Sequence, residues 1–217
     1  MIFYFLLTII TQLVSPPFSL HEGDLLFQDS DCGSFCDAIE KVTEGYEGAN
    51  LSHVGIVIRD EDRTLKVIEA IGTGVVLTEI DTFLARSHDT EGQSKVIVGR
   101  LQERHQSMIP LAIKHAKSLL GSAYDEVFDL QNDTYYCSEL VYESFKSANL
   151  GKSIFKTYPM TFIDPDTQKT FGIWTEYYKE LGKPIPENEP GLNPGGISRS
   201  EHIDIVHMYG IPSGMRR

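Results

Sequence analysis

The sequence has few of the features that mark several large classes of protein. Its 19 Lys and Arg residues are outnumbered by 31 Asp and Glu residues, which gives a formal net charge of −12. Such a balance argues against nucleic-acid binding, because neutralising phosphates requires clustered cations. No basic run is longer than Arg216-Arg217, so an anionic membrane surface is also a poor partner. Three cysteines provide no disulfide framework, but 217 residues, 41% of them hydrophobic, suffice for a buried core.

Only one long apolar run is present, at residues 1–14, and Pro16 and Pro17 follow it. The run is shorter than the ~20 residues that span a bilayer, but it fits the apolar region of a secretory signal peptide. We therefore predict that residues 1–19 are a signal peptide, that the protein is exported (periplasmic or extracellular), and that no stable membrane span remains after processing. An uncleaved anchor stays open as the alternative, because no Lys or Arg precedes the run.

The remaining chain, residues 20–217, shows no internal repeat and no clean boundary, which indicates a single α+β domain with a loop-rich part from about residue 151. Alternating and β-branched patterns predict strands and amphipathic patterns predict helices. The expected strands are 23–27, 53–58, 65–71, 75–80, 95–101 and 203–208, and the expected helices are 35–42, 81–85, 108–120, 136–148 and 174–181.

The odd number of cysteines leaves at least one thiol unpaired within the chain. In an oxidising compartment Cys32 and Cys36 can pair, and the alternative is that both remain thiols. No second ligand pair follows them, so no metal site is predicted. Cys137 opens the predicted helix 136–148. A helix N-terminus stabilises a thiolate and offers N–H groups to an oxyanion, although a small buried cysteine is the ordinary alternative.

A thiolate nucleophile needs a base and a group that orients the base. His53 opens one predicted strand, and Glu69 interrupts the apolar run of the next, where a carboxylate is costly without a partner. If Asp60–Asp62 form a three-residue hairpin loop, paired positions sum to 122 and His53 lies directly opposite Glu69. A four-residue loop would place the two side chains on opposite faces.

Four segments in this order resemble the YiiX/YebB-type cysteine hydrolases, a circularly permuted branch of the NlpC/P60 papain-like superfamily. They are Gly23-Asp24-Leu25-Leu26, Ser52-His53-Val54-Gly55-Ile56-Val57, Val67-Ile68-Glu69-Ala70 and Tyr136-Cys137-Ser138-Glu139-Leu140-Val141. The resemblance implies an antiparallel sheet packed against helices that include the nucleophile helix, with no cofactor.

The same resemblance gives each candidate residue an expected role. It implies Cys137 as nucleophile, His53 as base and Glu69 as the orienting residue. Gly121-Ser122-Ala123-Tyr124-Asp125 is similar to a segment whose tyrosine assists the oxyanion, so Tyr124 is a candidate substrate or oxyanion residue. Tyr136 is a second candidate, although packing is its simpler role. Glu139 is expected to cap the helix.

The leading hypothesis is therefore an amidase or peptidase that forms an acyl-enzyme, acting on cell-wall-derived or other short peptides. Two alternatives remain: an acyltransferase or thioesterase with the same triad on lipid or acyl substrates, and a non-catalytic peptide- or lipid-binding module. Pro159-Met160 and Pro194-Gly195-Gly196 are expected to build walls of the substrate groove. Nothing in the sequence specifies an oligomeric state.

Overall fold

The computed structural model describes residues 18–216. Of the predicted signal peptide, only Phe18 and Ser19 fall within this range, and the rest lies outside the described residues. The Phe18 ring stacks on His207 with centroids 4.1 Å apart. No helix in the described part of the chain is long and apolar enough to cross a membrane.

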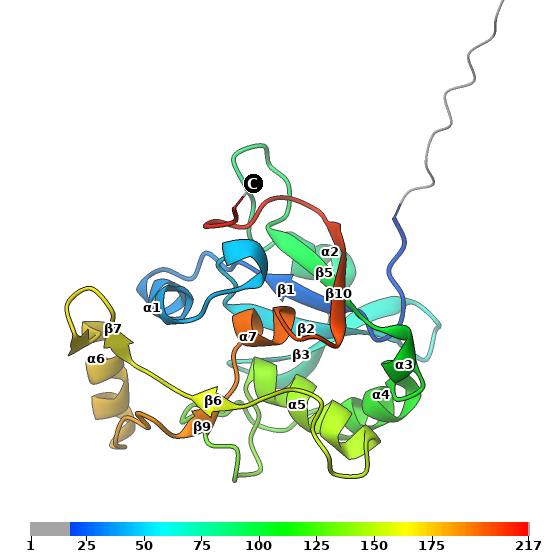
Figure 1. Cartoon of the computed structure of the whole chain (residues 1–217). Helices are drawn as coiled ribbons and strands as arrows, with labels where there is room; N and C mark the ends of the chain where they lie inside the picture. Colours follow the sequence, from blue (N-terminus) through cyan, green and yellow to red (C-terminus); the bar gives the residue numbers. More distant parts are fainter. Residues whose placement is uncertain (1–17, 217) are drawn as a thin grey trace, which may run out of the picture.

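A six-stranded antiparallel sheet forms the centre of the fold, in the order β10-β5-β1-β2-β3-β4 (Figure 1). Its strands are β1 (Leu25–Gln28), β2 (His53–Arg59), β3 (Leu65–Ile71), β4 (Gly74–Glu79), β5 (Val96–Leu101) and β10 (Ile203–Met208). All six expected strands are thus present, with ends that differ from the predicted ones by two residues at most.

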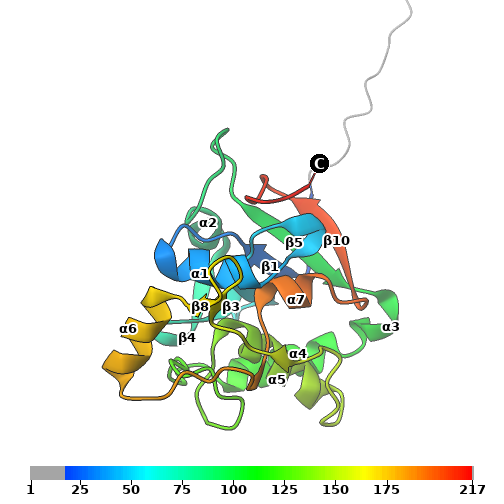
Figure 2. The same ribbon diagram turned by 60° about the vertical axis from the view of Figure 1, so that its left-hand side comes forward.

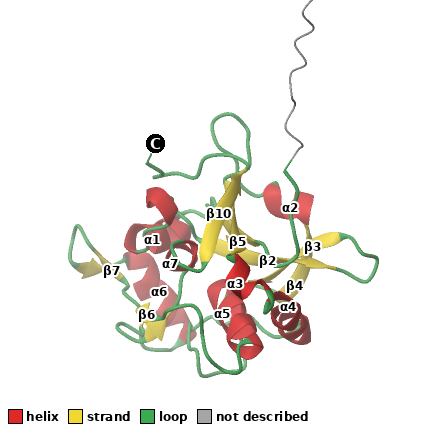
Figure 3. Ribbon diagram, turned by 45° about the vertical axis from the view of Figure 1, so that its right-hand side comes forward, coloured by secondary structure: helices red, strands yellow, loops and turns green. Residues whose placement is uncertain are grey.

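Both faces of the sheet are covered, which explains why its central strands are so rich in Val and Ile. The helices α4 (Ile109–Ser118) and α5 (Cys137–Ala148) pack on one face, where Leu140, Val141 and Phe145 of α5 join the main core. The short α2 (Ile80–Leu84) covers part of the other face and buries Phe83 there. Figure 3 shows α4 and α5 beside each other, with the sheet between them and α2.

The hairpin of β2 and β3 differs from the predicted register. Paired residues sum to 124 and not 122, as in Ile56↔Ile68 and Arg59↔Leu65. The loop shifts by one residue because Asp60 N–H donates to the Thr64 carbonyl and leaves 61–63 as the three-residue turn. A shift of two positions in the sum keeps His53 and Glu69 on the same face, but it makes them diagonal neighbours.

The C-terminal third is more regular than its Pro- and Gly-rich sequence indicates. It contains α6 (Gly172–Leu181), α7 (Pro194–Ser198) and two small ribbons, β6 (Tyr158–Pro159) with β9 (Pro190–Gly191) and β7 (Ile163–Asp164) with β8 (Lys169–Thr170). The predicted helix 174–181 is confirmed, whereas α7 was not expected. The short α3 (Glu103–Gln106) and a 3-10 turn at Tyr46–Gly48 complete the elements.

The helix α1 (Ser34–Val42) joins this C-terminal third to the sheet. It packs against α6 and β7, and Figures 1 and 2 show α1 and α6 next to each other. Ala38 of α1 shares a separate apolar cluster with Phe162, Trp174 and Tyr178. The side of α1 that faces α6 is therefore part of a second, smaller core outside the main sheet.

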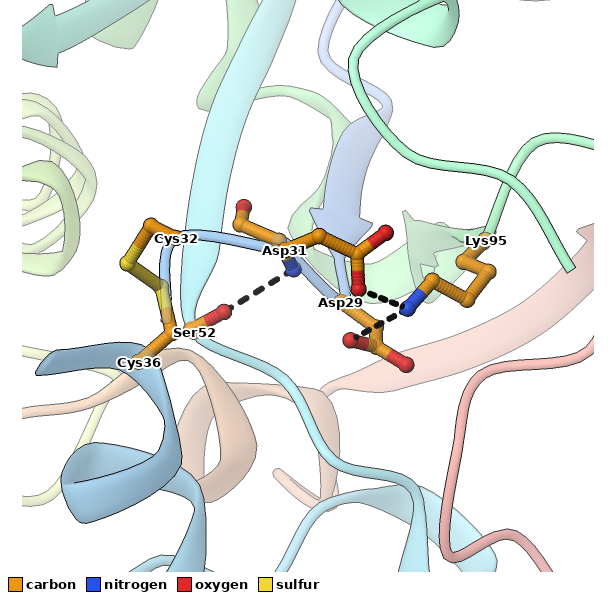
Figure 4. Close-up of a disulfide and its surroundings, with 7 residues drawn as sticks. Asp29, Asp31, Cys32, Cys36, Ser52 and Lys95 are labelled. Carbon is orange, nitrogen blue, oxygen red and sulfur yellow. Dashed lines mark hydrogen bonds and ion pairs between the residues drawn. A yellow bond between two sulfur atoms is a disulfide. The ribbon is translucent and has the colours of Figure 1, made fainter. Parts of the chain in front are cut away.

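A disulfide between Cys32 and Cys36 closes the first turn of α1, so the paired alternative is the one present. Figure 4 shows the bond beside the end of β1, where Lys95 Nζ donates to Asp29 at 3.0 Å and to Asp31 at 2.6 Å. The Ser30 N–H donates to the Ser52 hydroxyl at 3.0 Å. These contacts fix the segment that leads from the sheet into α1.

Candidate active site

Cys137 is the first residue of α5, and the sequence around it explains its fixed position. Leu140, Val141 and Phe145 follow on the buried side of the helix, which holds α5 against the sheet. Glu139 accepts a hydrogen bond from the Tyr136 N–H at 3.4 Å, as a helix cap does. The thiol is 7% exposed and is the one free cysteine of the described residues.

The Cys137 thiol lies against polar groups of two elements. His53 and the Val54 N–H come from the start of β2, and the Ser138 hydroxyl lies 3.9 Å from the sulfur. Burial alone would raise the pKa of Cys137, but hydrogen bonding and charge from His53, with help from Ser138 and Val54, lower it below its ordinary value. The surroundings therefore favour the thiolate over the thiol.

The His53 imidazole lies between this thiol and Glu69. Its Nε2 is 2.6 Å from Glu69 Oε2, so Nδ1 is the ring nitrogen left to interact with Cys137. Burial by itself lowers the pKa of His53, but interactions with Cys137 and Glu69 outweigh burial and raise the pKa to about 9. At neutral pH the imidazole is therefore protonated, and it lies beside a thiol whose pKa it lowers.

Glu69 is fully buried in β3, directly opposite Gly55 of β2. A Cβ atom on Gly55 would lie 2.3 Å from Val67 Cγ1, which is too close, and 3.4 Å from Glu69 Cβ, so a side chain there would force Val67 to move. The absence of a side chain at position 55 leaves room for the diagonal reach from His53 to Glu69.

Two further residues hold the Glu69 carboxylate. Arg86 makes a bidentate pair with it, with Nη1 at 2.7 Å from Oε2 and Nη2 at 2.5 Å from Oε1. The Thr78 hydroxyl donates to Oε1. Burial on its own would raise the pKa of Glu69, but Arg86 and His53 lower it to about 2. The carboxylate is therefore an anion across the whole range in which proteins normally fold.

Sequence reasoning missed both Arg86 and Thr78. Thr78 is on β4, where it pairs with Val67 and so shares a face with Glu69; only the strand register reveals this. Arg86 follows α2 in an irregular segment, and no pattern in the sequence ties it to β3. A buried acid in an apolar strand was the available signal that a cation had to lie nearby.

Both candidate tyrosines border the cavity beside Cys137, but their hydroxyls have different surroundings. Tyr124 lines the same cavity as Cys137, and burial, together with the charge of Cys137, raises the pKa of its hydroxyl, which therefore stays protonated and able to donate. The Tyr136 hydroxyl instead accepts a hydrogen bond from the Leu192 N–H at 3.1 Å. Tyr136 thus ties the segment after β9 to the start of α5.

Glu139 lies close to Cys137 in sequence, but its side chain is buried in the protein. Burial, and then the nearby Asp125, raise the pKa of Glu139 to about 9. At neutral pH the cap of α5 is therefore a carboxylic acid, which adds no second negative charge close to the Cys137 thiolate.

A cavity of about 610 Å³ opens beside Cys137, His53 and Tyr124. Pro159 and Met160 line it on one side and Pro194 and Gly196 on another, so both predicted wall segments do border the cavity. The Cys32–Cys36 disulfide and Arg86 also reach it. Large apolar side chains of α1, of the segment between α4 and α5, and of the C-terminal third make up much of its wall: Phe35, Ile39, Phe128, Met160, Phe162 and Trp174.

Across residues 18–216, no three His, Cys, Asp or Glu side chains converge in a way that could hold a metal ion. The polar groups at Cys137 are instead occupied by one another, in the order thiol, imidazole, carboxylate and guanidinium.

The arrangement of a cysteine helix after a histidine strand defines a papain-like hydrolase with a permuted chain order. Comparison with known families agrees: residues 19–207 match the family described as permuted papain-like amidase enzymes, YaeF/YiiX, C92 family, and the chain belongs to that family. The expected family and fold class are thereby confirmed.

Two relatives cover most of the chain. It is 27% identical over 203 residues to the uncharacterized protein YiiX of Escherichia coli strain K12, which is 92% of this chain and 94% of the relative. A crystal structure of YiiX from Escherichia coli O157:H7, described as a metalloprotein, matches with a TM-score of 0.68 and 26% identity. That match covers 87% of this chain and 97% of the other.

The buried carboxylate predicts a specific pH dependence of stability. The pKa of Glu69 is about 2 in the folded chain and ~4.3 in an unfolded one. Its stabilising contribution is therefore complete above about pH 4.3 and is lost as the pH falls toward the folded value. Glu69→Gln should lower the free energy of unfolding by about 3 kcal/mol at neutral pH, and urea titrations should show this deficit shrinking in acid.

Glu79→Gln is the matched control, since Glu79 is 62% exposed and pairs with Lys66 on the neighbouring strand. It should cost less than about 1 kcal/mol. A Glu69→Gln protein whose stability deficit is the same in acid as at neutral pH would contradict the assignment of Glu69 as the buried anion.

Proposed function

We propose that this protein cleaves an amide bond through Cys137, with His53 as the proton carrier and Glu69 as the group that orients it. The observation that carries the proposal is the continuous contact from the Cys137 thiol through His53 to a Glu69 carboxylate fixed by Arg86. This chain of contacts lowers the pKa of a thiol that lines a large cavity, which is what a nucleophile requires.

In the first half of the reaction the Cys137 thiolate attacks the amide carbonyl carbon and forms a C–S bond. The carbonyl oxygen becomes an oxyanion, which the N–H groups in the first turn of α5 and the Tyr124 hydroxyl are placed to receive. The His53 imidazolium gives its proton to the leaving nitrogen as the C–N bond breaks. The products of this half are a thioester on Cys137 and a free amine.

In the second half water attacks the thioester carbonyl while neutral His53 takes its proton. The C–S bond then breaks, the acid leaves, and the thiolate–imidazolium pair is restored. Throughout, Glu69 keeps its bond to His53 Nε2, which holds Nδ1 toward the sulfur. Every step uses residues of this chain. One relative is described as a metalloprotein. The described residues of this chain contain no group of three His, Cys, Asp or Glu side chains that could hold a metal ion.

The cavity favours a substrate with a large apolar group. The hypothesis of short peptides came from resemblance alone, whereas the aromatic and aliphatic side chains of α1, β6 and α6 surround a volume of about 610 Å³. A long acyl chain would bury its methylenes there at ~0.8 kcal/mol each. We therefore place the acyl part of the amide in this cavity, and acyl transfer from a lipid remains the second candidate, supported by the same observation.

We also propose that the protein works outside the cytoplasm. The Cys32–Cys36 disulfide persists in an oxidising compartment. The apolar run at residues 1–14 supplies the export signal in this proposal.

Loss of the thiol should abolish the reaction. Without reductant, iodoacetamide should label Cys137 alone, and Cys137→Ala should remove both the label, read by mass spectrometry, and the hydrolysis of a decanoyl amide.

Hydrolysis by the unaltered protein should decline above about pH 9, because His53 then loses the proton that the leaving amine needs.

The control is the double variant Cys32→Ser/Cys36→Ser, which should keep the label on Cys137. Hydrolysis that survives in Cys137→Ala at an unchanged rate would exclude this thiol as the nucleophile.

Acyl length separates the two substrate classes. For straight-chain acyl amides from butanoyl to decanoyl, kcat/KM should rise by up to about fourfold per methylene as the cavity fills. Ile39→Asn should flatten this dependence, since Ile39 lines the cavity, whereas Leu150→Ala should not, since Leu150 is 95% exposed. Equal kcat/KM values across the series, with faster cleavage of short peptides, would favour a peptidase.

A further inference from the structure

We propose that a second, smaller cavity beside the active-site cavity binds an anionic group on the amine side of the substrate. This inference rests on the proposed amidase function. The substrate it defines is an amide that joins an apolar acyl group to an amine bearing a carboxylate or a phosphate.

The second cavity has a volume of about 210 Å³ and shares walls with the first. Tyr158, Gly196 and Arg199 border both. Because these three residues border both, the two cavities are neighbours, and in this proposal the ligand extends past them from Cys137 into the second cavity. Gly196 belongs to α7, whose position is fixed by Asn193, which accepts a hydrogen bond from the Gly196 N–H at 2.6 Å.

The two cavities differ in chemistry. Aromatic and aliphatic side chains dominate the first, whereas the second brings together two cations, Lys156 and Arg199, with a single acid, Glu201. The chain as a whole carries a formal net charge of −12, so a cavity with more cations than anions differs from the rest of the protein. Local positive charge of this kind attracts and orients an anion.

These cations have spare hydrogen-bonding capacity. Within residues 18–216, Lys156 forms no ion pair, and the one ion-pair partner of Arg199 is Glu44, at 3.8 Å. The Arg199 side chain is 49% exposed, so it can turn toward a ligand.

Arg104 adds positive charge next to the cavity. Its Nη2 lies 3.2 Å from His202 Nδ1, and His105 Nε2 lies 3.1 Å from the same nitrogen. An anion in the cavity therefore faces Lys156 and Arg199 directly, with Arg104 behind His202. Glu201 carries one negative charge, which offsets only part of the positive charge of Lys156 and Arg199.

The geometry thus divides the substrate into three parts. The acyl chain lies against the apolar wall of the first cavity, the scissile amide lies at Cys137, and the anionic group of the amine reaches Lys156 and Arg199. The reaction would release a fatty acid and an amino acid or a phosphorylated amine. Water supplies the oxygen and the protons, and no further reactant is needed.

Binding tests this division without depending on turnover. The Cys137→Ala variant should be titrated calorimetrically with three ligands of one acyl length: N-decanoylglycine, N-decanoylethanolamine phosphate and neutral N-decanoylethanolamine. The better of the two anions should bind about tenfold more tightly than the neutral amide. The carboxylate and phosphate arms then identify which anion the cavity takes.

Lys156→Ala and Arg199→Ala should then be added to the Cys137→Ala variant. The ratio of the Kd of the neutral amide to the Kd of the better anionic ligand should fall to about 1, because only the anionic ligand binds more weakly. Arg199→Lys should keep most of the preference. Lys152→Ala and Arg63→Ala are matched controls, since both residues are exposed and neither lines the cavity. They should leave the ratio unchanged.

A ratio near 1 before the cations are removed, or a ratio that survives their removal, would overturn the anion site. Hydrolysis by the unaltered protein is read separately. If the binding preference is present but no amide is cleaved, then the proposed function fails and the anion site stands. If amides are cleaved but the anionic ligands bind no more tightly than the neutral one, then the anion site fails and the proposed function stands.

Discussion

A buried negative charge organises the centre of this protein. The Glu69 carboxylate lies inside a β-sheet, where an unpaired charge would be too costly to keep, so the surrounding structure must supply partners. Arg86 and Thr78 satisfy it on one side and His53 on the other. Because the charge is fixed, His53 stays protonated and Cys137 can ionise. The lowered pKa of the thiol is thus a consequence of how the sheet accommodates one acid.

The backbone contributes to this arrangement at few points. Gly55 leaves space across from Glu69, and the hairpin turn sets a register in which His53 reaches the carboxylate diagonally. Helix α5 begins at Cys137 and is held by apolar residues on its buried side. A protonated Glu139 caps the helix without a competing charge. Each of these features is ordinary alone. Together they bring four polar side chains into successive contact: Cys137, His53, Glu69 and Arg86.

Much of this was predictable from sequence, since hydrophobic periodicity indicates strands and helices well where the patterns are long. The strand from Leu65 to Ile71 and the helix from Cys137 to Ala148 are examples. The prediction that His53 and Glu69 share a face was also correct. Side chains alternate between the two faces of a sheet, so an error of two in the sum of paired residue numbers leaves them on the same face. The register itself, Arg86, Thr78 and helix α7 were not predictable. They depend on turn conformation and on contacts between distant segments, which no local pattern encodes.

The central claim is that the charge of Glu69 reaches Cys137 through His53 and lowers the pKa of the thiol. Ultraviolet absorbance of the thiolate, followed against pH as a difference between the unaltered protein and Cys137→Ala, measures this directly. The account predicts a thiolate that persists well below the ~8.5 of a free cysteine, and a rise of its pKa toward that value in Glu69→Gln. A Cys137 pKa at or above the free value, or one that Glu69→Gln leaves in place, would contradict it.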